Sequence, residues 1–200
     1  MNWRSRIYFS PAFYAIHYLG VVRKALGGRN MVYGYYDKQN HRFLKRCRIA
    51  STAIITDIQN LRIEDNVWIN HYVRIDAAGG VSLGEGCQIG YNACILSHST
   101  HNSIRLMGYH FMEYEAEQRA GYIAKHTSIG RYTFIGGGSY IMPGVSVGKG
   151  CVIGVNSVVT SDLPDYSIAV GSPARIIGST KQIDREFGHN PLVKKYYYDQ

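Results

Sequence analysis

The chain has 200 residues, of which 46% are hydrophobic, and 22 lysines and arginines outnumber 14 aspartates and glutamates, for a formal net charge of +8. This length allows one domain with short appendages, and the excess of cations favours anionic partners. The four cysteines form no CxxC or Cys/His pattern, which excludes zinc-finger and dithiol redox classes. The longest early apolar run, Pro11 to Val22, falls short of the ~20 residues that span a bilayer, and no signal-peptide pattern is present. We therefore expect a cytoplasmic protein.

Residues 1–30 are expected to form a helical lead-in. Ser10 is a suitable N-cap, and Pro11 stands at the first helical position, where its missing N–H costs nothing. Apolar residues then recur at helical spacing until two glycines end the run: Phe13, Ile16, Leu19, Val22, Leu26. We expect this helix to pack on the open end of the folded core. An alternative is a helix that lies on the inner face of a membrane, an interpretation helped by five cations: Arg4, Arg6, Arg23, Lys24, Arg29.

Residues 31–48 combine aromatic and cationic side chains: Tyr33, Tyr35, Tyr36, Arg42, Lys45, Arg46, Arg48. Such a mixture can bind single-stranded nucleic acid. No nucleic-acid-binding motif accompanies it, however. We therefore expect no nucleic-acid partner, and we predict an irregular first coil for this segment.

A six-residue repeat organises the chain from residue 63 to residue 164. An aliphatic residue opens every hexad: Ile63, Ile69, Ile75, Leu83, Ile89, Ile95, Ile129, Ile135, Ile141, Val147, Ile153, Val159. A period of six fits neither an α-helix nor an alternating strand. It fits a solenoid of short strands in which three hexads make one coil and the opener points into the core. The fifth place of the hexad is small or β-branched, which identifies Cys87 and Cys151 as small buried residues.

The repeat stops for residues 101–128 and then resumes at Ile129. Irregular segments of this length inside compact repeats are usually functional, and this one is charged and aromatic, so we expect partial order. Beyond the repeat, Ser179–Phe187 is predicted to be a short helix, because Ser179 and Gln182 match a capping box and Gly188 suits the C-terminal end. The predicted organisation is a lead-in (1–48), a β-helix domain (49–178) and a C-terminal helix and tail (179–200).

The run IGRYTFIGGGSYIMPGVSVGKGCVIGVNSVVTSDLPDYSIAVGSPARIIG resembles the hexapeptide-repeat acyltransferases, and within them the branch that acetylates sugars and polysaccharides. The resemblance covers about residues 49–178. It implies a left-handed parallel β-helix, a homotrimer with active sites between subunits, acetyl-CoA as acyl donor and no metal. It also implies that the acceptor is a hydroxyl of a sugar or polysaccharide. The net charge favours an acidic glycan, such as a capsule or lipopolysaccharide unit.

The motif ILSHSTHN, residues 95–102, lies where the repeat breaks. Acyl transfer from a thioester to a hydroxyl needs a base, and neutral histidine is the natural base near pH 7. The resemblance implies that a histidine at this place is the base. We favour His101 in that role, with His98 as its neighbour or as an acceptor-binding group. A base histidine needs an acceptor on its other ring nitrogen. Backbone carbonyls could serve, as could three glutamates: Glu113, Glu115, Glu117.

The resemblance also implies that the pantetheine arm of CoA lies along the coils after the break. The matching positions are Gly137, Gly138, Val155, Thr160 and Arg175. The two glycines would let the backbone approach the arm, and Arg175 could hold a phosphate with its planar fork. Lys149 and Lys181 are alternative phosphate contacts.

Four residues are predicted to contact the acceptor. Asn70 aligns by the repeat with a substrate-contacting position of the family that the chain resembles. Tyr72, Arg74 and Arg105 could reach an anionic acceptor. For Asn70 the simpler interpretation is a corner residue, because asparagine tolerates left-handed geometry.

Three other functions stay open. N-acetylation of an amino sugar would use the same residues. A zinc lyase similar to the hexapeptide-repeat carbonic anhydrases would need three converging histidines. His98, His101 and His126 are available for that, but they lack the His-x4-His pair of that family. A non-catalytic scaffold would leave the break in the repeat and its paired histidines unexplained.

Overall fold

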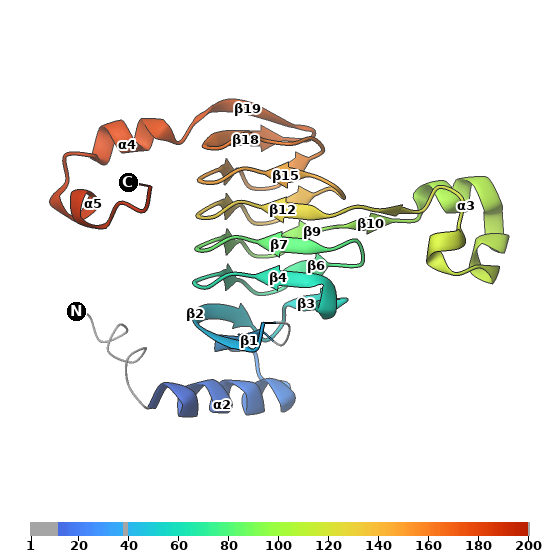
Figure 1. The fold of residues 1–200 in the computed structure, drawn as a ribbon, viewed down its shortest axis with the longest axis horizontal. Helices are drawn as coiled ribbons and strands as arrows, with labels where there is room; N and C mark the ends of the chain where they lie inside the picture. The colour runs from blue at the N-terminus through green and yellow to red at the C-terminus, as the bar shows by residue number, and fades with distance from the viewer. Residues whose placement is uncertain (1–11, 38–39, 200) are drawn as a thin grey trace.

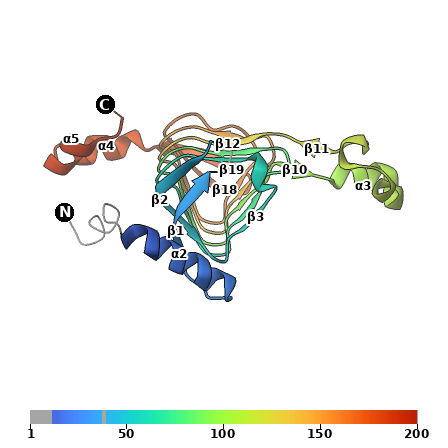
Figure 2. The ribbon, with the colours of Figure 1, turned by 60° about the horizontal axis from the view of Figure 1, so that its bottom comes forward.

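The computed structural model describes residues 12–37 and 40–199. They form a parallel β-solenoid (Figure 1) with a triangular cross-section (Figure 2). We name its three faces sheets A, B and C. Sheet A contains β1 (Met31–Asp37), β2 (Arg42–Ala50), β5 (Trp68–Ile69), β8 (Gln88–Ile89), β13 (Phe134–Ile135), β16 (Val152–Ile153), β18 (Ser167–Gly171) and β19 (Ala174–Ser179).

The other two faces are shorter. Sheet B contains β3 (Ile54–Thr56), β6 (Arg74–Asp76), β9 (Cys94–Ile95), β14 (Tyr140–Ile141) and β17 (Val158–Val159). Sheet C contains β4 (Leu61–Ile63), β7 (Val81–Leu83), β12 (Thr127–Ile129) and β15 (Ser146–Val147). The chain turns from C to A, from A to B and from B to C, and we name these turns the C–A, A–B and B–C corners. A 3-10 helix, η1 (Ile58–Asn60), precedes β4.

The predicted aliphatic ladder forms the core. Register pairs place Ile69, Ile89, Ile135 and Ile153 above one another on sheet A, and equivalent columns run along the other two faces. None of the twelve hexad openers is more than 2% exposed. The hexapeptide solenoid predicted from the repeat is therefore confirmed. Stacking supplies the core because no single coil buries enough apolar area alone.

The fifth-place residues are buried beside the openers, with one exception. Cys87 and Cys151 are 0% exposed, as predicted, and burial raises the pKa of the Cys87 thiol to about 12. Ser99 is the exception, because it has left the coil and lies on β10 (His98–Ser99). Thr127 fills the corresponding place when the coil resumes, and its hydroxyl donates to the Leu96 carbonyl at 2.7 Å.

The break in the repeat is an excursion that projects sideways from the solenoid (Figure 1). Strand β10 pairs antiparallel with β11 (Ile123–Ala124) at its base. Between them lie α3 (His101–Met107) and two 3-10 helices, η2 (Gly108–Glu113) and η3 (Ala116–Gln118). The excursion therefore starts before residue 101 and ends by Thr127, slightly earlier at both ends than the sequence indicated.

The N-terminal end differs from the expected irregular first coil. Strands β1 and β2 form an antiparallel hairpin that extends sheet A. Helix α2 (Ala12–Ala25) packs against β1 and lies across this end of the solenoid (Figure 1). The predicted cap at Ser10 and Pro11, and the cations Arg4 and Arg6, lie outside the described residues. No helix in the described parts of the chain is long and apolar enough to cross a membrane.

The C-terminal segment folds back against the C–A corner. Helix α4 (Lys181–Phe187) forms where a helix was predicted, but Thr180 is its N-cap and no side chain caps it, so the predicted capping box is absent from this end. Helix α5 (Pro191–Tyr196) follows. Asp199 then accepts a hydrogen bond from Lys149 at 2.8 Å, and the Tyr198 ring lies 4.1 Å from the Tyr132 ring.

Candidate functional site at the B–C corner

The B–C corner at the base of the excursion is held by a buried serine. The Ser97 hydroxyl accepts from the Gly79 N–H at 2.8 Å and donates to the Asp76 carbonyl at 2.7 Å. The Lys125 N–H donates to the Ser97 carbonyl at 2.8 Å, which ties the returning strand to the same point. A Cβ at Gly79 would lie 2.4 Å from the Ser97 carbonyl oxygen, so this close approach requires glycine.

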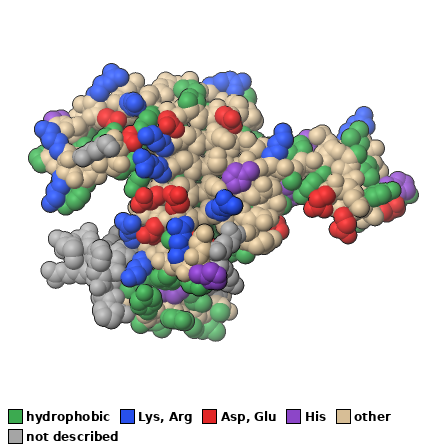
Figure 3. Space-filling view, in the orientation of Figure 1, with side chains coloured by type: hydrophobic (Ala, Val, Ile, Leu, Met, Phe, Trp, Pro, Cys, Tyr) green, Lys and Arg blue, Asp and Glu red, His purple; other side chains and the backbone are tan. Residues whose placement is uncertain are grey.

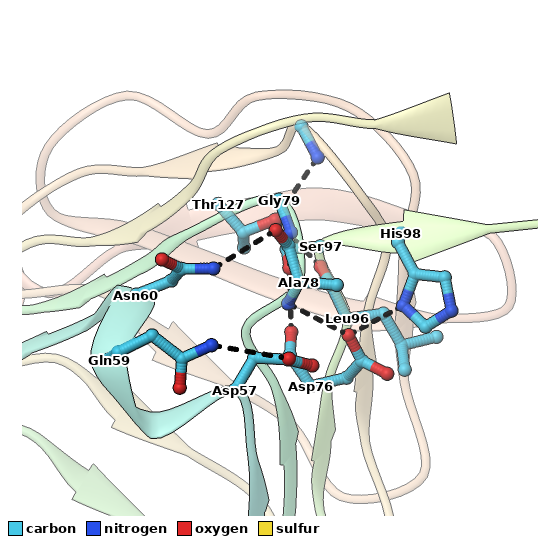
Figure 4. A network of polar contacts seen from close by, with 11 residues as sticks. Asp57, Gln59, Asn60, Asp76, Ala78, Gly79, Leu96, Ser97, His98 and Thr127 are labelled. Carbon is cyan, nitrogen blue, oxygen red and sulfur yellow. Dashed lines mark hydrogen bonds and ion pairs between the residues drawn. The ribbon is translucent and has the colours of Figure 1, made fainter. Parts of the chain in front are cut away.

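His98 and Asp76 form the most specific contact at this corner. Nδ1 of His98 lies 2.6 Å from Oδ1 of Asp76, and the same oxygen accepts from the Ala78 N–H at 3.2 Å. A carboxylate can only accept, so Nδ1 carries the proton and Nε2 is left with a lone pair. The two side chains are 31% and 16% exposed, which keeps Nε2 within reach of a ligand. Figure 4 shows Asp76 between His98 and the Ala78–Gly79 turn.

His101 has a different environment. It begins α3, it is exposed, and its Nδ1 lies 2.7 Å from the Ser99 hydroxyl. A hydroxyl fixes a ring less firmly than a carboxylate and stabilises the imidazolium less. The geometry therefore favours His98 over His101 as a base, the reverse of the preference drawn from the sequence.

The three loop glutamates are not the partners of either histidine among the described contacts. Glu113 lies 3.1 Å from Nδ1 of His110, and Glu115 caps η3 through a capping box with Gln118. The carboxylate at the site is Asp76, which the sequence interpretation missed. A signal was available: Ile75 pairs with Ile95, so Asp76 must stand beside Leu96, two residues before His98.

A cavity of about 620 Å³ opens on the sheet C side of the same corner. Its polar lining comes from η1 and β4 on one side and from the returning strand on the other: Gln59, Asn60, Arg62, His126. Ala124, which lies opposite His98 in the β10–β11 pair, also lines it. The His126 ring packs over Gly80, where a Cβ would lie 2.7 Å from Nδ1. The cavity and the His98–Asp76 pair are therefore neighbours across one turn.

The residues predicted to bind CoA do not gather at one corner of the chain. Gly137, Gly138 and Val155 occupy the A–B corner, while Thr160 lies at the opposite edge of sheet B. Thr160 stands in the same column as Asp76, because each directly follows a paired core residue of sheet B. Val155 is 71% exposed. Gly138 has a φ of 70°, and a Cβ there would lie 2.1 Å from Oδ1 of Asn156, so the local structure favours glycine at this position whether or not CoA binds.

The cationic candidates are divided: Arg175 lies beside the A–B corner, opposite Val170, whereas the two lysines lie apart from these positions. Arg175 is exposed on β19, and its Nη1 donates to the Ala174 carbonyl at 3.0 Å. Lys149 is held by Asp199, and Nζ of Lys181 lies 4.5 Å from the centroid of the Tyr166 ring. These two lysines belong to the C–A corner region, which does not border sheet B.

Of the four predicted acceptor contacts, one shares a strand with Asp76. Arg74 is exposed two residues earlier on β6, so the two side chains leave the same face of sheet B. The Asn70 amide donates to the Ile89 carbonyl at 3.0 Å and links two coils. Tyr72 sits at the A–B corner with a φ of 62°, and Arg105 lies on α3 in the excursion.

Three comparisons place the chain among known proteins. A family model described as bacterial transferase hexapeptide (six repeats) matches residues 126–161. Serine acetyltransferase of Bacillus pumilus (strain SAFR-032) is 30% identical over 157 residues, which cover 76% of this chain and 66% of the relative. The chain belongs to the hexapeptide-repeat transferases. Galactoside O-acetyltransferase of Escherichia coli (strain K12) is 23% identical, over 84% of this chain and 85% of that protein.

This hexapeptide-repeat chain also resembles solved structures. A hexapeptide-repeat-containing acetyltransferase of Vibrio cholerae O1 biovar eltor, complexed with acetyl coenzyme A, is 29% identical with a TM-score of 0.53, over 64% of each chain. The chain spans between 33% and 66% of the length of the first curated relatives that it matches. Within the described residues no three His, Cys, Asp or Glu side chains come together as a metal site, so His98, His101 and His126 do not converge within one chain.

Proposed function

We propose that this protein is an acetyl-CoA-dependent O-acetyltransferase that acts on a saccharide hydroxyl, with His98 as the general base. The observation that carries the proposal is the His98–Asp76 pair, 2.6 Å apart at the one place where the repeat breaks. A carboxylate on Nδ1 fixes the tautomer and leaves Nε2 to accept a proton. The serine acetyltransferase relative and the acetyl-CoA complex of the Vibrio protein support the choice of acyl donor.

The reaction is a direct transfer. His98 Nε2 takes the proton of the acceptor hydroxyl, and the oxygen attacks the thioester carbonyl to form a tetrahedral intermediate. The C–S bond then breaks, and the departing thiolate takes the proton from the His98 imidazolium, so the base returns to its starting state. Asp76 stabilises the imidazolium in between. Ser99 lies beside His101, but no carboxylate orients that histidine among its described contacts, which favours direct transfer over a seryl intermediate.

The acceptor is proposed to lie in the cavity beside the pair. Two amides and a guanidinium line it, Gln59, Asn60 and Arg62, and no carboxylate appears among its lining residues. Amides bind hydroxyl groups, and a guanidinium binds a carboxylate or phosphate in a bidentate way. This lining suits an acidic saccharide, such as a unit of a capsule or lipopolysaccharide. The E. coli relative is named for acetylation of a galactoside.

The placement of CoA and the assembly complete the proposal. We propose a left-handed coil and a homotrimer in which CoA lies against sheet B and its two edges, touching Gly137, Gly138, Val155, Thr160 and Arg175. Exposed apolar side chains on sheet B and at its A–B edge support the proposal that CoA or a neighbouring subunit covers this surface. Tyr140 is 46% exposed and Val155 is 71% exposed. The site lies between subunits and the protein is cytoplasmic in this proposal.

The test measures release of free CoA thiol from acetyl-CoA with a panel of acidic and neutral saccharides and one amino sugar. For the stimulating acceptor, His98→Ala is expected to lower kcat by about 10²–10⁴-fold. His101→Ala, the matched control in the same motif, is expected to lower it less than about tenfold. Ser99→Ala should leave kcat within the same limit.

Three outcomes contradict parts of the proposal. If His101→Ala abolishes release and His98→Ala does not, the base is His101. If only the amino sugar stimulates release, the enzyme is an N-acetyltransferase. If no acceptor stimulates release and acetyl-CoA does not bind, the proposed transferase activity is wrong, and zinc content becomes the next measurement.

A further inference from the structure

Helix α2 is apolar on both sides. Its inner side packs on the β1–β2 hairpin, where Phe13 is 1% exposed and its ring lies 6.1 Å from the Phe43 ring. His17 contacts the same ring at 5.0 Å. The outer side carries large apolar groups that are at least 42% exposed: Tyr14, Tyr18, Leu19, Val21, Val22, Leu26. We name these six residues the α2 outer face.

The exposed fractions on this face are large. Tyr18 and Leu19 are both 68% exposed, Val22 is 53% exposed, and Leu26 just after the helix is 81% exposed. Residues 14, 18 and 22 recur at four-residue spacing and therefore form one stripe along the helix. A helix that is apolar all round is normally buried on all sides, and a contiguous exposed apolar patch marks an interaction surface.

The charged residues in and next to α2 in the sequence are all of one sign. The first acidic residue of the whole chain is Asp37, while five of its cations precede that position. Of these, Arg23 and Arg29 are described and exposed, and Nζ of Lys45 lies 5.8 Å from the Tyr14 ring centroid. A two-fold contact between the α2 outer faces of two copies would bring this cationic rim against itself, which is unfavourable. An anionic partner is favoured instead.

We propose that the α2 outer face docks on the surface of an anionic lipid bilayer. Apolar side chains flanked by tyrosines and cations are the composition that enters the headgroup region of such a membrane. The helix lies across one end of the solenoid (Figure 1), so a flat surface can meet it lengthwise while the excursion points sideways. In Figure 3 hydrophobic side chains gather at this lower end, with Lys and Arg groups beside them.

Docking in this way has a consequence for orientation. The stack of coils would stand on the membrane, with the His98–Asp76 corner above the surface. An acceptor held at the same membrane would then be presented to the side of the solenoid. The inference itself rests on α2 alone and holds whether or not the proposed acetyl transfer is correct.

The experiment is co-sedimentation of the full chain with phosphatidylcholine vesicles, with and without phosphatidylglycerol. The wild-type protein is expected to bind the phosphatidylglycerol vesicles at least about tenfold better than the neutral ones, and added salt should weaken binding. The double variant Leu19→Glu/Val22→Glu should lose at least about tenfold in binding. Its circular dichroism and its thiol release with a soluble acceptor should match those of the wild type, because both positions are solvent-exposed.

The matched control is Ile104→Glu/Leu106→Glu in the excursion. Leu106 is 66% exposed and Ile104 is 51% exposed, close to the values at Leu19 and Val22. This control should bind vesicles as the wild type does. The proposal is overturned if the wild type binds neither vesicle, or if both double variants lose binding equally. It is also overturned if Leu19→Glu/Val22→Glu abolishes self-association in light scattering while vesicle binding is absent, because the occupant would then be a second copy.

Discussion

The two uninterrupted coils from Ile129 to Leu163 and the B–C corner below them use buried hydroxyl groups in the same way but differ in the turns that these groups hold. In the coils the Thr133 hydroxyl donates to the Gly148 carbonyl and the Ser139 hydroxyl to the Gly154 carbonyl, both at 2.8 Å. Each bond links one coil to the next and leaves nothing to bind. At the corner, the Ser97 hydroxyl makes the same pair of contacts, but the turn that it holds carries Asp76 as well as Gly79.

The coils and the corner therefore serve different purposes: the coils stabilise the fold, and the corner carries the groups that we propose for catalysis. Coils repeat the same contact, so their polar groups are satisfied within the stack and their openers are fully buried. The corner interrupts that pattern, and there a histidine and a carboxylate meet while staying partly exposed. The base that we propose stands where the repeat is broken, because an unbroken repeat satisfies its polar groups within the stack.

The largest expected effect is on catalysis at the corner. Asp76→Asn should lower kcat by roughly 10²–10⁴-fold, because an amide can donate to Nδ1 and stabilise the wrong tautomer of His98. Steady-state thiol release with the best acceptor measures it. The unfolding free energy should fall by only about 0.5–1.5 kcal/mol, because an amide that donates to His98 gives up the hydrogen bond from Ala78, which uses the same oxygen position. A variant with normal kcat would mean that the pair is only structural.

A slightly smaller effect is expected on stability in the coils. Ile135→Ala removes a residue that is 0% exposed and should lower the unfolding free energy by about 2–5 kcal/mol. Urea unfolding followed by circular dichroism measures it. In the excursion, Leu106→Ala should change that free energy by less than about 0.5 kcal/mol, because Leu106 is 66% exposed. Equal losses at the two positions would show that the excursion folds as part of the core.

The smallest effect concerns the cavity beside the corner. Arg62→Gln should raise KM for an acidic acceptor about tenfold with kcat nearly unchanged, the loss expected for one charge-assisted hydrogen bond. Arg131→Gln at the C–A corner is the control, since Arg131 is also exposed but lies near Asp199. KM for a neutral acceptor should be insensitive to both changes. A uniform rise in KM for every acceptor after Arg62→Gln would place the acceptor elsewhere.

Sequence reasoning was reliable where one local rule applied at every step. The hexad openers predicted the inward column of each face, and every one of them is buried. It was weaker where the rule stopped. For residues 31–48 it predicted an irregular coil, whereas Tyr33 and Tyr35 alternate with buried residues in an antiparallel hairpin. An antiparallel pair forms where the chain reverses its direction, and the six-residue repeat carries no signal for such a reversal.

The candidate site shows the same division. The break at ILSHSTHN indicated the segment in which we propose the base, but the choice between His98 and His101 depended on which ring meets a carboxylate. That carboxylate is 22 residues away in the sequence, on the coil below. Glu113, Glu115 and Glu117 were candidates because they are close to the histidines in the sequence. Asp76 is close to His98 only because the coils stack on one another.

The sequence by itself determined the solenoid, because a period of six sends one aliphatic residue per hexad inward whatever the neighbouring coils contain. It also determined where that solenoid is interrupted. Only the tertiary structure decided which groups meet at the interruption, since Asp76 and His98 become neighbours through the vertical register of two coils. Only the structure decided which side of α2 is covered, because a helix that is apolar all round carries no signal for the choice between its faces.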